Sequence, residues 1–294
     1  MKNKPLIITL IVVLSIIAIA ITWLMINLLT GKFSLNSFRF FSSTSKELAV
    51  DETYNIDFNN INISVESGDI YVRETADNNF KVIIYNEKEK TVVNTLNNKL
   101  NIEVKSKKCI GFCFNVDSKV EVYVPKDYQY DMKITNKFGD IEVGSFEKAT
   151  IDIEEDCGDV SVLTANVVNI NNEYGDIEIG KVNVANVSDS AGDIEIEEVH
   201  DAKVNNNFGD IEINTVLNYL DVNNDCGDIE IDNVTLNKDS KITDDLGEIK
   251  IGKTNEININ AETDLGDVKI KNNYPKSEVT LTIENNCGSI KVDN

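Results

Sequence analysis

A short glycine-centred motif occurs nine times between residues 139 and 290 of this 294-residue chain, and it constrains the fold more than any other feature. The motif is Gly-Asp-Ile or a close variant, as in Gly175-Asp176-Ile177. Its glycines are Gly139, Gly158, Gly175, Gly192, Gly209, Gly227, Gly247, Gly266 and Gly288. Successive glycines are 17–22 residues apart, and another copy, at Gly68, lies 71 residues before the first. A period of this length indicates an array of stacked structural units.

Each repeat unit alternates apolar and polar residues. The residues two and four positions after every glycine are apolar and the residue between them is polar, as in Ile177-Glu178-Ile179. This period of two predicts a β-strand with one buried face. Equivalent positions in successive units match in size and polarity, which favours parallel stacking over an antiparallel meander. We therefore predict an all-β fold, a single-stranded parallel β-solenoid (β-helix) with coils of 17–22 residues.

Two further columns accompany the glycines. Three positions before each glycine the residue is polar and mostly Asn or Asp, residues that suit turns and can form a side-chain ladder between coils. This column comprises Asn136, Glu155, Asn172, Asp189, Asn206, Asn224, Asp244, Thr263 and Asn285. The position directly before glycine is apolar and includes Cys157, Cys226 and Cys287, which we interpret as small core residues. Three or more coils separate each pair of these cysteines, too far for a disulfide.

The N-terminal segment carries a membrane signal. Leu6–Leu29 contains no charged residue, and as a helix it is about 36 Å long, enough to cross a bilayer core. We predict a transmembrane signal anchor at 6–29, a short cytoplasmic tail at 1–5 and a juxtamembrane stalk at 30–50. Lys2 and Lys4 favour a cytoplasmic N-terminus. The alternative is a cleaved signal peptide, but cleavage after Ala20 would leave an apolar start to the mature chain.

The remaining residues are expected outside the cytoplasm. The predicted solenoid spans 51–294, with irregular longer coils over 51–135 and regular Gly-Asp-Ile repeats over 136–294. A separate small β domain is the alternative for the first of these stretches. The chain has 28 Lys and Arg against 50 Asp and Glu, a net charge of −22, and this excess of acid argues against nucleic-acid binding.

The acidic residue that directly follows eight of the nine glycines is the strongest candidate for a site. Asp176, Asp193, Asp210 and Asp228 would lie along one edge of the stack, where carboxylates about 5 Å apart repel unless a cation or solvent offsets them. A calcium or other divalent-cation edge is therefore one hypothesis, and an Asp that caps its own turn and faces water is the favoured one. We predict no metal, no cofactor and no catalytic residues. Cys109 and Cys113 are candidates for a small disulfide loop in an oxidising compartment.

A resemblance to a known family rests on these same features. The serial Gly-Asp-Ile-Glu-Ile copies and the strand Val120–Pro125, which ends in proline, resemble the bacterial putative-adhesin β-strand-repeat family, a domain of unknown function that includes LiaG-like membrane proteins. The resemblance covers about residues 50–294 and implies an anchored extracytoplasmic β-solenoid. It implies no catalytic residues.

These observations lead to a functional expectation. We expect a single-pass protein of the cell membrane, not an enzyme, that acts as a cell-envelope accessory or regulatory module linked to envelope stress. An adhesin or surface-ligand-binding protein is the alternative, and a carbohydrate-active β-helix enzyme is less favoured. Expected partners are the membrane, through Leu6–Leu29, and another envelope protein or a cell-wall component.

Overall fold

The computed structural model of the protein describes residues 47–86, 90–106 and 118–293. The expected cytoplasmic tail, the anchor Leu6–Leu29 and the pair Cys109 and Cys113 lie outside these ranges, so they stay predictions. The described residues contain no helix that is long and apolar enough to cross a membrane. Strand β1 begins at Leu48, inside the last residues of the expected stalk.

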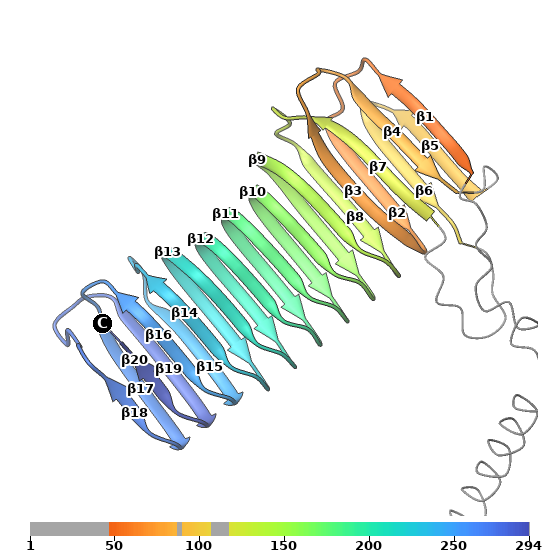
Figure 1. The fold of residues 1–294 in the computed structure, drawn as a ribbon. Helices are drawn as coiled ribbons and strands as arrows, with labels where there is room; N and C mark the ends of the chain where they lie inside the picture. The colour runs from red at the N-terminus through yellow and green to blue at the C-terminus, as the bar shows by residue number, and fades with distance from the viewer. Residues whose placement is uncertain (1–46, 87–89, 107–117, 294) are drawn as a thin grey trace, which may run out of the picture. The chain divides into compact units, whose positions relative to one another are not determined.

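The described elements are β-strands, and they form one continuous sheet that winds into a stack of coils (Figure 1). The strands are β1 (Leu48–Tyr54), β2 (Asn60–Val65), β3 (Gly68–Thr75), β4 (Phe80–Tyr85), β5 (Thr91–Leu96), β6 (Lys99–Val104), β7 (Ser118–Pro125), β8 (Asp131–Asn136), β9 (Ile141–Glu155), β10 (Val160–Asn172), β11 (Ile177–Asp189), β12 (Ile194–Asn206), β13 (Ile211–Asn224), β14 (Ile229–Val234), β15 (Ser240–Leu246), β16 (Ile249–Thr254), β17 (Asn258–Leu265), β18 (Val268–Ile270), β19 (Thr280–Cys287) and β20 (Ile290–Val292).

The middle of the stack confirms the parallel β-solenoid. Each of β9 to β13 is a long strand that bends between its two halves, and a Gly-Asp turn leads into the next coil. In β11 the buried and exposed residues alternate up to Ile179, but Gly180 and Lys181 both face outward before Val182 is buried again. This slip in the alternation marks the bend. Strands β11 and β12 pair in parallel from Ile177 opposite Ile194 onward, so equivalent residues of neighbouring coils lie side by side.

The core is a single apolar cluster along the stack, built mainly from Ile and Val. Such β-branched side chains suit stacked parallel strands because they pack against their equivalents on both sides. At the N-terminal end, aromatic rings extend the cluster. The Phe58 and Phe80 rings meet edge to face with centroids 4.9 Å apart, and the Tyr128 ring lies 6.0 Å from that of Phe80.

The N-terminal end departs from the predicted all-parallel arrangement. Strands β2 and β3 lie between the outer coil β6–β7 and the inner strands β8 and β9, so the order of coils in space differs from their order in the chain. Outside β6–β7, strands β1, β4 and β5 add on in antiparallel pairing. In the described part of this region, β2, β3, β6, β7 and β8 pair in parallel as coils of the stack. The antiparallel strands cover the edge of these coils and reduce the exposed ladder of backbone groups.

The C-terminal end is also out of sequence order. Strand β19 pairs with both β15 and β17, and β20 pairs with both β16 and β18. The final coil of the chain, β19–β20, therefore lies between earlier coils, and β17 and β18 form the outer edge. Figure 1 shows this arrangement beside the C-terminus. The coil that contains Val292 therefore does not end the stack, although it is the last repeat in the sequence.

Candidate functional site

The glycine of each turn is required by the close approach of neighbouring coils. At Gly175 the backbone angle φ is +136°, which favours glycine, and an added Cβ would lie 2.1 Å from the carbonyl oxygen of Gly158. No side chain fits at that distance. The Gly175 N–H also donates a hydrogen bond to the carbonyl oxygen of Ala191 in the following coil, at 3.1 Å. The glycines thus pack the turns into a continuous edge along the stack.

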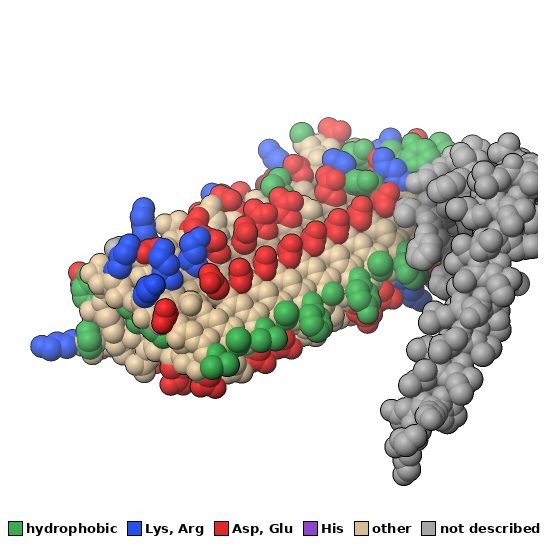
Figure 2. Space-filling model, turned by 60° about the horizontal axis from the view of Figure 1, so that its bottom comes forward, with side chains coloured by type: hydrophobic (Ala, Val, Ile, Leu, Met, Phe, Trp, Pro, Cys, Tyr) green, Lys and Arg blue, Asp and Glu red, His purple; other side chains and the backbone are tan. Residues whose placement is uncertain are grey.

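The predicted acidic column lies on this edge and forms what we term the aspartate ladder: Asp140, Asp159, Asp176, Asp193, Asp210 and Asp228. Each carboxylate Oδ1 accepts a hydrogen bond from the backbone N–H of the acidic residue in the next coil, at 2.7–3.1 Å. Figure 2 shows rows of acidic side chains along the molecule. The expectation that each Asp caps its own turn is therefore corrected: its carboxylate caps the turn of the neighbouring coil.

The ladder brings the four predicted residues Asp176, Asp193, Asp210 and Asp228 into register but not into a cluster. Within the described ranges, no group of three His, Cys, Asp or Glu side chains is placed to hold a metal ion. The carboxylates instead form charge-assisted hydrogen bonds with the backbone, which offset part of the repulsion between neighbours. The arrangement explains why an acid recurs at this position.

A second outward column changes sign along the stack. It carries Glu178, Glu195, Glu212 and Glu230 on β11 to β14 and then Lys250 on β16. Glu230 lies directly opposite Lys250 and forms an ion pair with it. Both side chains are exposed, so the pair contributes only about 0–1 kcal/mol.

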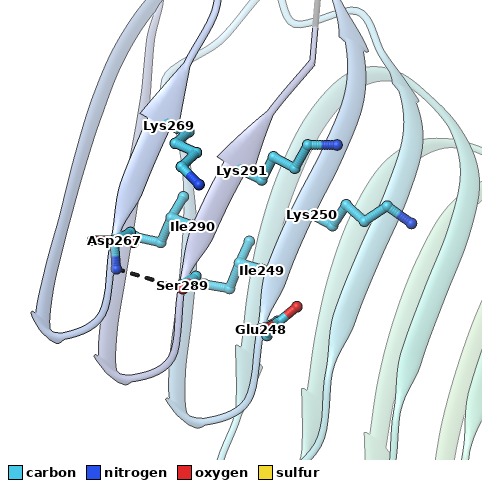
Figure 3. A pocket seen from close by; sticks show the side chains of 8 residues that line it. All are labelled: Glu248, Ile249, Lys250, Asp267, Lys269, Ser289, Ile290 and Lys291. Atoms are coloured by element: carbon cyan, nitrogen blue, oxygen red, sulfur yellow. Dashed lines mark hydrogen bonds between the residues drawn. The ribbon is translucent and has the colours of Figure 1, made fainter.

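The lysines of the last coils form a basic end. Lys250, Lys291 and Lys269 lie in register on β16, β20 and β18, and Figure 3 shows them on three adjacent strands. They line a shallow hollow together with Glu248 and Asp267. Carboxylates therefore share the hollow with the lysines and offset their charge.

The polar column three positions before glycine is buried, which the sequence did not reveal. Its Asn side chains do not bond to one another; instead they donate to glycine carbonyl oxygens of the turns. Asn224 Nδ2 donates to the carbonyl oxygens of Gly227 at 2.9 Å and Gly209 at 3.1 Å, and Asn136 bonds in the same way at the first regular turn. We term this set the buried polar column: Asn136, Glu155, Asn172, Asp189, Asn206, Asn224, Asp244 and Asn285.

Three acids interrupt this column, and each lies between two amides. Glu155, for example, lies opposite Asn136 on one side and Asn172 on the other. Burial raises the pKa of Glu155 to about 8, because desolvation of the carboxylate outweighs the hydrogen bond from the Cys157 N–H. Burial likewise raises the pKa of Asp189 to about 6 and that of Asp244 to about 6. These carboxyls take up protons at a higher pH than exposed ones do.

The apolar position before each glycine is on the surface. Phe138, Tyr174 and Phe208 are 54%, 59% and 62% exposed. Figure 2 shows a line of hydrophobic side chains along the molecule. Cys157 and Cys287 are exposed as well, and Cys226 is partly exposed. The interpretation of these cysteines as core residues is therefore wrong. Cys226 and Cys287 are also only two coils apart, because β19–β20 follows β16 in space.

The family follows from the match that spans this fold. Residues 58–293 match the family model described as Toastrack DUF4097, and this range includes the described strands from β2 to β20. The chain belongs to the Toastrack DUF4097 family. The resemblance found in the sequence is thereby confirmed at the level of a family of unknown function, and the LiaG-like relationship stays a prediction.

Individual solved structures resemble this Toastrack chain at low identity. A putative adhesin from Bacteroides fragilis and a putative lipid binding protein from Parabacteroides distasonis are each 17% identical, with TM-scores of 0.42 and 0.43. A putative adhesin from Parabacteroides merdae is 13% identical, with a TM-score of 0.42. Each alignment covers 84% of this chain and 98% of the other. No curated protein is significantly similar to the chain.

Proposed function

We propose that the protein is a membrane-anchored, extracytoplasmic surface module of the cell envelope with an accessory or regulatory role linked to envelope stress. It acts by presenting extended faces to another envelope component and not by catalysis. The observation that supports this most directly is the register of its outward side chains. Equivalent residues of neighbouring coils lie side by side, as in the pairing of Glu178 with Glu195, so side chains of one kind continue over several coils.

Such a surface suits recognition of an extended partner. Neighbouring strands are about 4.8 Å apart, and a solenoid holds this spacing over many coils because each coil packs on the next. The hydrogen bonds of the aspartate ladder fix the turns, and the Ile and Val core fixes the strands. The surface is therefore ordered before a partner arrives, which lowers the entropy cost of binding.

The membrane topology is tested with protease on intact cells that carry the chain with a C-terminal tag. Residues 51–294 should be degraded from outside while a tag placed at the N-terminus is protected. Degradation of the N-terminal tag, or protection of the C-terminal one, would contradict the proposed orientation. Release of the C-terminal part into the medium in the absence of protease would favour the cleaved signal peptide.

The regulatory role is tested by deletion of the gene and complementation. We expect altered output from envelope-stress promoters and unchanged attachment to surfaces. The reverse result, lost attachment with unchanged promoter output, would favour the adhesin or surface-ligand-binding alternative. The less favoured carbohydrate-active enzyme predicts glycan cleavage that a combined Asp176→Asn, Asp193→Asn and Asp210→Asn variant abolishes; cleavage by wild type would contradict the non-enzymatic proposal.

A further inference from the structure

The exposed apolar residues before the glycines form a single straight line. We term this line the apolar ridge, and in spatial order it comprises Phe138, Cys157, Tyr174, Ala191, Phe208, Cys226, Leu246, Cys287 and Leu265. Each step is fixed by a backbone hydrogen bond: the Gly158 N–H donates to the carbonyl oxygen of Tyr174 at 2.9 Å, and the same bond recurs at every turn. The ridge therefore belongs to the hydrogen-bonded frame of the molecule.

The ridge alternates large and small side chains. Phe138, Tyr174, Phe208, Leu246 and Leu265 are large and 54–70% exposed, and a Cys or Ala separates each from the next. With coils about 4.8 Å apart, the large side chains recur about every 10 Å and leave a notch above each small one. Scattered surface apolar residues are ordinary, but a continuous line of them is typical of an interaction site.

Carboxylates follow the ridge on both sides in the chain. A residue of the aspartate ladder stands two positions after each of the first six ridge residues, Phe138 to Cys226. Five further acids directly precede ridge residues: Asp156, Glu173, Asp225, Asp245 and Asp264. Acidic side chains are visible above and below the green line in Figure 2. In the described part of the chain, none of these carboxylates forms an ion pair with Lys, Arg or His.

We propose that the apolar ridge binds a cationic amphipathic polypeptide segment. The apolar side chains of this segment occupy the notches between large ridge residues, and its Lys and Arg side chains pair with the flanking carboxylates. We choose a cationic partner because the side chains that flank the ridge are acidic and attract positive charge. A second copy of the chain brings the same acidic rows and a net charge of −22, and an anionic lipid surface is likewise repelled.

This inference names the partner class for the proposed surface role, yet it fails separately from that role because its test uses purified protein. The full-length chain is held in nanodiscs of zwitterionic lipid, and the probe is a fluorescent helix-forming peptide of Leu and Lys. Empty nanodiscs give the background, and the matching Leu and Glu peptide is the charge control. We expect saturable binding of the Leu and Lys peptide alone, about tenfold weaker in 0.5 M than in 0.05 M salt.

Two variants separate the contributions to binding. Tyr174→Ser with Phe208→Ser removes two large ridge side chains, and Asp156→Asn with Glu173→Gln and Asp225→Asn removes three flanking charges. The matched control, Glu178→Gln with Glu195→Gln and Glu212→Gln, removes three charges from the next outward column. Both test variants should weaken binding about tenfold or more and the control about twofold or less. All of these side chains are exposed, so the melting temperatures of the variants should stay close to that of wild type.

Several results would overturn the inference. The first is no binding of the peptide by wild type, and the second is full binding by the Tyr174→Ser, Phe208→Ser variant. The third is an equal loss of affinity in the variant that lacks the three flanking charges and in the Glu178, Glu195 and Glu212 control, which would mean that net charge alone attracts the peptide. Binding to anionic vesicles in preference to the peptide would assign the ridge to lipid. A concentration-dependent dimer that the ridge variant abolishes would assign it to a second copy.

Discussion

The buried carboxyl of Glu155 makes the stability of the stack depend on pH. Its pKa in the folded chain is about 8, against 4.5 for an ordinary Glu. Between these values the folded chain holds a proton that the unfolded chain has released, so stability falls as the pH rises from about 4.5 to 8. Below pH 4.5 both states are protonated, and the stabilising contribution is complete.

The size of this effect follows from the difference between the two pKa values. At about 1.4 kcal/mol per pKa unit, ionising Glu155 in the folded stack costs at most about 5 kcal/mol. The adjoining Cys157 is exposed, so water reaches the turn when the carboxylate forms, and we expect a measured cost of about 2 kcal/mol. Glu155→Gln keeps the shape and the acceptor oxygen but does not ionise. Its melting temperature at pH 8 should exceed that of wild type by about 4–8 °C.

The assay is thermal unfolding followed by circular dichroism at pH 4.5 and pH 8. Glu147→Gln is the matched control, because it replaces one exposed Glu of the same coil and should change the melting temperature by no more than about 2 °C at either pH. A gain for Glu155→Gln that is as large at pH 4.5 as at pH 8 would refute the reasoning. So would a loss of stability at both.

The remaining predictions concern the turns and the cysteines. Gly175→Ala should destabilise the protein by about 3 kcal/mol or more in a denaturant titration, because its Cβ would meet the Gly158 carbonyl oxygen at 2.1 Å; a loss under about 1 kcal/mol would contradict the close approach. Asp176→Asn should retain the ladder hydrogen bond but remove one charge, so the stability should depend less on salt. Asp176→Ala removes the hydrogen bond and should lower the free energy of unfolding by about 1 kcal/mol. Equal effects of the two variants on stability would contradict the capping role. A thiol-reactive probe should label Cys157 and Cys287 in the folded protein, because both side chains are exposed. Labelling only after unfolding would show that they are buried.

Much of the fold could be predicted because apolar residues alternate with polar ones along each strand. When one face of such a strand packs on an apolar core, the alternation determines which side chains are buried. Once Ile177 faces inward, Glu178 must face outward and Ile179 inward, and the same assignment holds in every coil. The opposite charges at Glu230 and Lys250 agree with the parallel register, since only in-register stacking makes these two residues neighbours. These inferences depend on local geometry that the turn does not disturb.

The sequence did not predict that the residues of the apolar ridge are exposed, because they lie in the turns. Alternation is broken between Asn172 and Ile177, so it does not determine which way Tyr174 points. The variation of side-chain size along the column could have revealed the exposure. Side chains in the buried columns have nearly constant volume, whereas the ridge position changes from Ala191 to Phe208 in the next coil. A close-packed interior does not accommodate such a change between neighbouring layers.

The order of coils at the two ends could not be obtained from the repeat. All Gly-Asp-Ile units present nearly the same faces, so several stacking orders satisfy the pattern equally well. The longer spacing of the last copies, up to 22 residues, and the 71 residues before Gly139 were the only traces of the rearrangement. In the same way, the polar column gave no sign of burial, because Asn and Asp suit both an exposed turn and a buried bond to a carbonyl oxygen.

The displaced final coil has a consequence for how this molecule is made and how its gene can change. A chain that leaves the ribosome residue by residue can lay down β9 to β16 in order, but the places beside β15 and β16 are filled only when β19 and β20 arrive. The C-terminal edge is therefore completed only when β19 and β20 have followed β17 and β18 in the chain. We expect duplication of one unit to be tolerated best between β9 and β14, where chain order and spatial order coincide.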